Sequence, residues 1–239
     1  MNFFRNTRLE KKLLSLEIEN KILRALYLDN LEKKDGTADF GLLPFNGQKN
    51  RKKILTPILE KFSPDVILET GTYLGNTTLF LSTFAPYIKT CELNSLLYQN
   101  AQNKFKDFSK IEVFNLDSRE FLRAQVPTLK TKKVFCYLDA HWYDDLPLQF
   151  ELKLLRTIND VIVVIDDFEV PGDPGLGYDR YGKKKLNFDL ISEEVIKGSW
   201  KVQYPAGQSK TETGSKRGWV MLSKGTYADQ STDKALDCS

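Results

Sequence analysis

The feature that most constrains the fold is a regular alternation of short apolar segments with amphipathic helical segments between residues 65 and 166. Strands that alternate with helices in this way predict βαβ units, and hence an α/β fold with a doubly wound, Rossmann-like, mostly parallel sheet. The continuous apolar run at 161–165 is typical of a strand covered on both faces. The predicted strands are 65–69, 88–92, 111–115, 134–139 and 161–166, and the predicted helices run from Gly75 to Phe84 and over 95–105, 118–124 and 148–158.

Helices are expected before this unit, and an antiparallel edge after it. Leucines and isoleucines recur at helical spacing over 6–34, which predicts an amphipathic helix that packs on the domain or forms a homodimer. Two late strands would form a C-terminal edge hairpin, and the polar tail is expected to fray. The further predicted elements are helices at 49–62 and 189–196 and strands at 200–204 and 218–222. These boundaries predict an N-terminal helical extension at 1–47, a main domain at 48–223 and a tail at 224–239.

Charge and cysteine content argue against several classes of protein. The formal net charge is +3, too small to indicate nucleic acid or an anionic membrane as a partner. No apolar run is long enough for a transmembrane helix, and the charged N-terminus does not resemble a signal peptide. The three cysteines lack the spacing of a zinc site or a disulfide framework. We therefore expect a cytoplasmic protein.

A glycine-containing turn follows the first predicted strand. A dinucleotide-binding loop would have glycines where Tyr73 and Asn76 stand, and the tyrosine would keep the backbone away from a pyrophosphate. The remaining pattern, Glu69-x-Gly71-x-x-x-Gly75-x-Thr77, suits a ligand with an adenosine but no phosphates. Such a ligand would also be held at the ends of the next two strands. Glu92 is placed to accept hydrogen bonds from ribose hydroxyls, and Asp117-Ser118 to hold the adenine amino edge.

These residues resemble the motifs of the class I S-adenosylmethionine-dependent methyltransferases. The run ETGTYLGNTT is similar to their first motif, Glu92 to their second-strand acid and Asp117 to their third-strand residue, and the resemblance covers residues 65–222. It implies that the main domain binds S-adenosylmethionine. The residues implied in cofactor binding are Glu69, Gly71, Thr72, Tyr73, Gly75, Thr77, Glu92, Asp117, Ser118 and Asp139.

Carboxylates follow the fourth and fifth predicted strands. Asp139 ends one strand, Asp166-Asp167 end the other, and the separation of 27 positions from Asp139 to Asp166 fits one intervening helix. Three carboxylates at one sheet edge would repel each other unless a cation joins them, and oxygen ligands suit Mg²⁺ or a similar divalent cation.

This arrangement resembles the divalent-metal-dependent O-methyltransferases of the catechol and antibiotic-sugar types. The resemblance implies that Asp139, Asp166 and Asp167 are the metal ligands. Trp142 stands where the catechol type has its lysine, so that base does not carry over. His141 is the candidate general base, with Asp139 as the reserve.

The segment after the metal pair, 168–185, is rich in glycine and proline and is expected to form a movable loop over the acceptor. Tyr178 and Tyr181 could cover a ring, and Arg180 could meet a carboxylate or phosphate. The lysines at 183–185 are expected to be solvated surface residues.

The function expected from these features is metal-assisted O-methylation of a small hydroxylated molecule with a vicinal diol, such as a sugar or a polyphenol. Three alternatives stay open. The chain could be a metal-independent methyltransferase acting on nitrogen or another acceptor, or a non-catalytic protein that binds an adenosine-containing ligand. It could also be a relative with other chemistry, since the cephalosporin hydroxylases have a similar Asp-x-His region.

Overall fold

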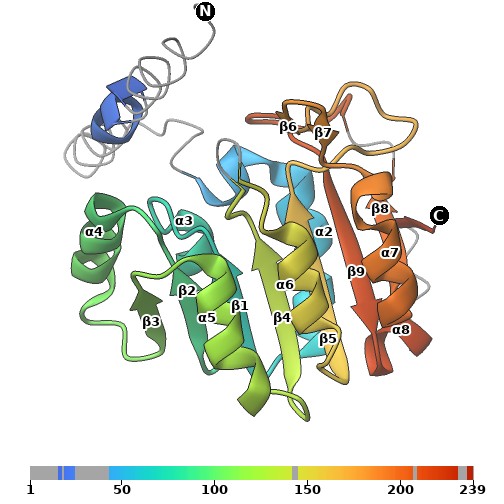
Figure 1. The fold of residues 1–239 in the computed structure, drawn as a ribbon, viewed down its shortest axis with the longest axis horizontal. Helices are drawn as coiled ribbons and strands as arrows, with labels where there is room; N and C mark the ends of the chain where they lie inside the picture. Colours follow the sequence, from blue (N-terminus) through green and yellow to red (C-terminus); the bar gives the residue numbers. More distant parts are fainter. Residues whose placement is uncertain are drawn as a thin grey trace, which may run out of the picture.

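The computed structural model describes residues 16–17, 19–24, 43–141, 145–206, 209–230 and 236–238. These residues form a three-layer α/β structure in which helices cover both faces of a central sheet (Figure 1). The sheet has eight strands in the order β10-β8-β9-β5-β4-β1-β2-β3. The predicted doubly wound, mostly parallel sheet is confirmed.

Five parallel strands form the part of the sheet that the apolar alternation predicted. The chain builds outward from β1 in one direction through β2 and β3, and then returns to the other side of β1 for β4 and β5. The strand order therefore reverses between β1 and β4, which is where ligands bind in folds of this kind. The strands are β1 (Val66–Thr70), β2 (Ile88–Cys91), β3 (Ile111–Phe114), β4 (Lys133–Leu138) and β5 (Asp160–Asp166).

The C-terminal strands are antiparallel. β8 (Lys201–Pro205) and β9 (Trp219–Lys224) pair as the predicted hairpin, and β9 lies between β8 and β5. The expectation of a frayed tail is wrong for the described residues after Lys224. Residues Thr226–Gln230 form α8, and Leu236–Cys238 form the edge strand β10 against β8. Burial of Tyr227 and Leu236 in the core explains why these parts of the tail are ordered.

Two apolar cores lie on the two faces of the sheet. Successive residues of β1, β4 and β5 point alternately into one core and the other, as the period of a strand requires. One core contains residues of α2 (Lys49–Phe62), α3 (Asn76–Leu81), α4 (Ser95–Phe105) and α8. The opposite core contains residues of α5 (Ser118–Gln125), α6 (Leu148–Leu155) and α7 (Phe188–Gly198). The short elements are η2 (Pro44–Gly47), η3 (Val126–Thr128), β6 (Arg180–Tyr181) and β7 (Lys184–Lys185).

Two helices end about one turn before their predicted boundaries, for one physical reason. At the end of α3, Ser82 and Thr83 donate their side-chain hydroxyls to the carbonyls of Leu79 and Phe80. At the end of α6, Thr157 donates its hydroxyl to the carbonyl of Leu154. Such side-chain bonds satisfy carbonyls that a longer helix would use, so the backbone can leave the helix.

Most of the predicted N-terminal helix at 6–34 lies outside the described residues. Residues 16–17 and 19–24 are helical, and Ile22 is buried against Tyr73, Leu74 and Leu97. The described part of this helix therefore packs on the domain, beside the turn after β1. Among the described residues, no helix has both the length and the apolar character needed to cross a membrane.

Candidate functional site

The candidate site lies at the carboxyl ends of the parallel strands. In the pairing registers, Thr70 at the end of β1 is opposite Leu138 of β4, and Leu138 is opposite Ile165 of β5. The turns that follow these three strands are therefore neighbours, as expected at the point where the strand order reverses.

The turn after β1 requires its glycines. Gly71 has φ +87°, and a Cβ there would lie 2.4 Å from the carbonyl oxygen of Asp139. Gly75 has φ +72°, and a Cβ there would meet the ring of Phe105 at 2.6 Å. Any side chain at either position would force strain and a clash. The two glycines thus let the turn pack tightly between the end of β4 and α4.

Three polar residues predicted to bind the cofactor also hold this turn in place. The Glu69 carboxylate is buried and accepts hydrogen bonds from the hydroxyls of Thr78 and, at 2.7 Å, Thr90. Burial raises the pKa of Glu69 to about 7, although these two hydrogen bonds oppose the rise. The Thr72 hydroxyl lies 2.6 Å from that of Thr90, and the Thr77 hydroxyl accepts from the Phe45 amide at 3.0 Å. Glu69, Thr72 and Thr77 therefore support the shape of the turn.

Glu92 lies at the end of β2, beside the same turn. Its carboxylate accepts hydrogen bonds from the amide of Tyr73 at 2.9 Å and from the amide of Asn94 at 2.8 Å. Burial raises the pKa of Glu92, and the backbone hydrogen bonds oppose the rise. The two amides fix the carboxylate on the side of the turn where the sequence predicted a ribose.

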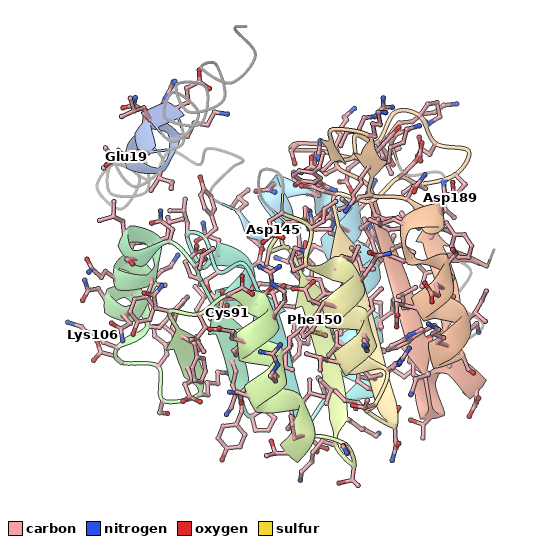
Figure 2. All side chains as sticks on the ribbon, viewed as in Figure 1. Glu19, Cys91, Lys106, Asp145, Phe150 and Asp189 are labelled. Carbon is pink, nitrogen blue, oxygen red and sulfur yellow. The ribbon has the colours of Figure 1, made fainter. Side chains whose placement is uncertain are left out.

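A pocket of about 450 Å³ opens at the ends of β2 and β3, and its lining begins with Leu93, the residue after Glu92. Asp117 lines it and caps α5 by accepting from the Arg119 amide at 2.8 Å. The Arg119 guanidinium lowers the pKa of Asp117 and also pairs with Asp145, which Figure 2 shows at the carboxyl end of the sheet. Ser118, the other residue predicted to face adenine, is buried. The pocket is lined by Leu93, Asn115, Leu116, Asp117, Arg119, Glu120 and Arg123.

Leu93, which lines this pocket, was not predicted from the sequence. Its side chain is 69% exposed although it is a large apolar residue. Ligand pockets commonly combine apolar side chains with a few polar groups, and Leu93 supplies an exposed apolar side chain here. The signal was its place directly after Glu92 in the sequence.

A second, smaller hollow lies between the glycine turn and Asp139. Its volume is about 30 Å³. Its lining includes Gly71, Tyr73, Gly75 and the acids Asp139 and Asp166. The hollow therefore lies where the glycine turn meets the ends of β4 and β5.

Asp139, His141 and Asp167 form the one group of potential metal ligands among the described residues. One ligand atom from each lies within 4.8 Å of the others. His141 Nε2 is 3.9 Å from Asp139 Oδ1 and 3.7 Å from Asp167 Oδ2. The imidazole is buried, and Nε2 has no hydrogen-bond partner among the described residues. A buried nitrogen that faces two carboxylates at these distances fits a site that takes a cation or a proton.

The electrostatics of these three residues differ. Burial, together with Asp166 and Asp167, raises the pKa of Asp139 well above its usual range. Burial would also raise the pKa of Asp167, but the nearby His141 and Arg217 lower it to about 2. Burial would lower the pKa of His141, but Asp167 and the other nearby carboxylates raise it. The carboxylates around Asp139 and His141 therefore favour a proton or a cation at this cluster.

Asp166 is separate from this cluster, although the sequence predicted it as a ligand. Its Oδ1 lies 2.5 Å from Nη1 of Arg51, and its Oδ2 accepts from the Tyr137 hydroxyl at 2.6 Å. All three side chains are buried. Arg51 was missed, but it had a sequence signal, because it shares the apolar face of α2 with Ile54, Leu55 and Ile58.

Arg217 and Tyr181 surround the cluster on the side away from β1. Arg217 Nε donates to Asp167 Oδ1 at 2.5 Å, and its Nη2 pairs with Asp179. The Tyr181 hydroxyl lies 2.7 Å from the carbonyl oxygen of His141 and 2.8 Å from Asp179 Oδ2. Tyr181 thus lies beside His141 and Asp179, whereas Arg217 was not predicted from the sequence. Trp142 lies outside the described residues.

The sequence matches no protein-family model and no curated protein, so the comparisons that bear on this site are with solved structures. An O-methyltransferase from Bacillus cereus in complex with SAH is 13% identical over 86% of this chain and 91% of that chain, with a TM-score of 0.54. A putative O-methyltransferase from Klebsiella pneumoniae is 13% identical over 74% and 80%, with a TM-score of 0.52. The O-methyltransferase TomG from Streptomyces achromogenes, in complex with SAM, is 15% identical over 73% and 80%, with a TM-score of 0.50. The chain therefore shares the Rossmann-like fold of these methyltransferases.

Proposed function

We propose that this protein is an S-adenosylmethionine-dependent O-methyltransferase that acts, with the help of a divalent cation, on a hydroxyl of a small molecule. The observation that carries the proposal is the adjacency of two features at one sheet edge. One is the glycine turn with Glu92 and the 450 Å³ pocket, and the other is the cluster of Asp139, His141 and Asp167. A donor and an acceptor that must meet for methyl transfer would be held side by side there.

The cofactor's adenosine would lie along the ends of β2 and β3. Leu93 would support the adenine ring, Asp117 and Ser118 would face its amino edge, and Glu92 would accept from the ribose hydroxyls. The amino-acid end would reach the small hollow that the glycine turn and Asp139 line. When bound, S-adenosylmethionine supplies an electrophilic methyl group on a sulfonium.

The ligand atoms that the chain offers fit a divalent cation. Asp139 and Asp167 present carboxylate oxygens in one place, and the buried His141 Nε2 faces them. Mg²⁺ commonly takes one or two carboxylates and completes its shell with water and substrate oxygens. We assign Asp139 and Asp167 as the ligands and exclude Asp166, because Arg51 and Tyr137 engage its carboxylate. A bound divalent cation would orient two neighbouring hydroxyls and lower the pKa of the one that reacts.

His141 is proposed as the general base. Mg²⁺ prefers oxygen ligands, so the imidazole is better suited to accept the proton of the acceptor hydroxyl at Nε2. The carboxylate of Asp167, 3.7 Å away, stabilises the imidazolium that results. In the methyl-transfer step, the acceptor oxygen would bond to the methyl carbon and the carbon–sulfur bond would break. The proton of the acceptor hydroxyl would pass to His141.

The experiment is a methyl-transfer assay against a panel of vicinal diols, with Mg²⁺ and with a chelator. We expect turnover that requires the metal. His141→Gln should lower kcat by about 10²- to 10⁴-fold while the Mg²⁺ affinity, measured by calorimetry, stays within about threefold. Turnover that is unchanged in the chelator would contradict the metal assignment and favour a metal-independent methyltransferase. A large loss of Mg²⁺ affinity in His141→Gln would instead make His141 a ligand.

A further inference from the structure

The β6–β7 ribbon lies directly beside the Asp139/His141/Asp167 cluster. The amide of Asp179, just before β6, donates to the carbonyl of Asp167 at 2.9 Å. Tyr181 of β6 contacts His141 through its hydroxyl, and the two rings have centroids 6.4 Å apart. Any acceptor whose hydroxyl reaches His141 would therefore have the ribbon as a wall. The inference below rests on the proposed function, because it concerns the acceptor of that same site.

The β6–β7 ribbon carries several positively charged side chains and no carboxylate that pairs with them. Arg180 and Lys185 are cross-strand partners, and Lys183 lies in the turn between the strands. Like charges placed opposite each other in an antiparallel pair are destabilising. Within the described residues, no carboxylate forms an ion pair with Arg180, Lys183, Lys184 or Lys185. An external anion would relieve this repulsion between like charges, because no carboxylate of the described residues pairs with these cations.

Lys184 is the cation on the face that looks toward the cluster. Side chains of a strand alternate between its two faces, and cross-strand partners share a face at roughly 5 Å. Tyr181 points to His141, and Lys184 is its partner in the pairing register. Arg180 lies on the other face, where its guanidinium stacks 4.8 Å above the ring of Tyr178, and Lys185 is its partner there.

Two of the acids near Lys184 are already engaged by another cation. Asp167 and Asp179 both pair with Arg217, and Asp179 also lies 2.8 Å from the Tyr181 hydroxyl. Lys184 itself is exposed, so its ammonium is free to reach a ligand. The sequence alone indicated only a solvated lysine run, and the pairing of Lys184 with Tyr181 changes that interpretation.

We propose that the acceptor carries an anionic group, a phosphate or a carboxylate, that binds against Lys184 and Tyr181 while its hydroxyl lies at His141. Arg180, Lys183 and Lys185 add to the attraction through their field, but they do not contact the group. The acceptor class is therefore an anionic diol, such as a sugar phosphate or a dihydroxylated aromatic acid.

The experiment compares matched probes with and without the anionic group. Binding of glucose 1-phosphate against glucose, and of 3,4-dihydroxybenzoate against catechol, is measured by calorimetry on protein with Mg²⁺ and S-adenosylhomocysteine. The first pair reports a phosphate and the second a carboxylate. We expect the anionic member of at least one pair to bind tenfold or more tightly than its neutral partner. Lys184→Glu should remove that preference, whereas Lys185→Glu, the same charge change on the other face, should keep most of it.

Two results would overturn the inference. One is the absence of any anionic preference in both pairs, whether the members bind equally or not at all. The other is an equal loss of preference in Lys184→Glu and Lys185→Glu, which would indicate the general field of the ribbon and no contact with Lys184. Titration with S-adenosylmethionine separates these failures from failure of the proposed function. If the cofactor binds and the anionic preference is absent, only the acceptor inference is wrong.

Discussion

Arg51 of α2 and Asp166 of β5 form a buried ion pair, with Nη1 and Oδ1 2.5 Å apart. The pair extends to the Tyr137 hydroxyl, which donates to Asp166 Oδ2, and to the carbonyl of Arg217, which accepts from Arg51 Nη2 at 2.8 Å. The pair therefore connects α2 and β4 to the segment that holds Asp167. The two adjacent aspartates therefore differ, since Arg51 and Tyr137 hold the Asp166 carboxylate, whereas Asp167 belongs to the cluster with Asp139 and His141.

Removing Arg51 should be costly because it leaves a buried charge without a partner. Arg51→Met is expected to lower the free energy of unfolding by about 3–5 kcal/mol. Arg51→Met combined with Asp166→Asn should be more stable than Arg51→Met alone, because the uncompensated carboxylate is gone. Urea unfolding of the two single variants and the double variant measures this. Additive losses in the double variant would show that the two residues do not form an energetically coupled pair.

The two neighbouring aspartates should differ in metal binding. Asp167→Asn is expected to weaken Mg²⁺ binding by at least about tenfold, because it removes a proposed ligand. Asp166→Asn should leave the Mg²⁺ affinity within about threefold while it lowers stability, because its carboxylate is held by Arg51. Calorimetric titration of both folded variants with Mg²⁺ measures the two affinities. The opposite order of effects would restore Asp166 as the ligand and argue against the assignment made here.

Glu151 of α6 should make stability depend on pH. Its side chain is 2% exposed, and burial raises its pKa from 4.5 to about 7. A carboxyl with a raised pKa stabilises the folded state when it is protonated, so its contribution is lost as pH rises from about 4.5 to about 7. Glu151→Gln should therefore gain on the order of 1–3 kcal/mol over the parent at pH 8 and little at pH 4.5. Chemical unfolding at the two pH values tests this, and an equal difference at both would contradict it.

The N-terminal helix should depend on one buried contact. Ile22 is 1% exposed against Leu74 and Leu97, whereas its neighbour Leu23 is 50% exposed. Ile22→Asp should release the amides of residues 19–24 to fast hydrogen exchange, because it places a charge in that contact. Leu23→Asp is the matched control and should leave their protection nearly unchanged. Equal exchange in both variants would mean that the helix does not pack through Ile22.

Much of the fold could be predicted from the sequence because strand and helix periodicities are local. The strand–helix alternation predicted the bounds of β1 to β5 to within one residue, because continuous apolar runs such as 161–165 are typical of buried strands. The ordered structure of the C-terminal tail was not predicted, because it depends on a contact between residues far apart in the sequence. Tyr227 packs against Phe62, and their ring centroids are 6.2 Å apart.

The candidate site was predictable only where its residues follow strands directly. Asp139, His141 and Asp167 meet because β4 and β5 are neighbours, which the topology implied. The engagement of Asp166 was not predictable, because its partner Arg51 lies 115 residues away in the sequence. The orientation of Lys184 likewise depended on its pairing with Tyr181, which no local pattern of lysines reveals.

The most direct test of the central claim is calorimetric titration of the protein with S-adenosylmethionine, repeated on Glu92→Ala. The variant removes the carboxylate that the Tyr73 and Asn94 amides hold at the end of β2, where the sequence predicts the ribose. Lys53→Glu, an exposed change on α2, is the control. The account predicts micromolar binding to the parent and to Lys53→Glu, and at least a tenfold loss in Glu92→Ala. No binding of S-adenosylmethionine to the parent protein would contradict the proposed function and leave only the α/β fold.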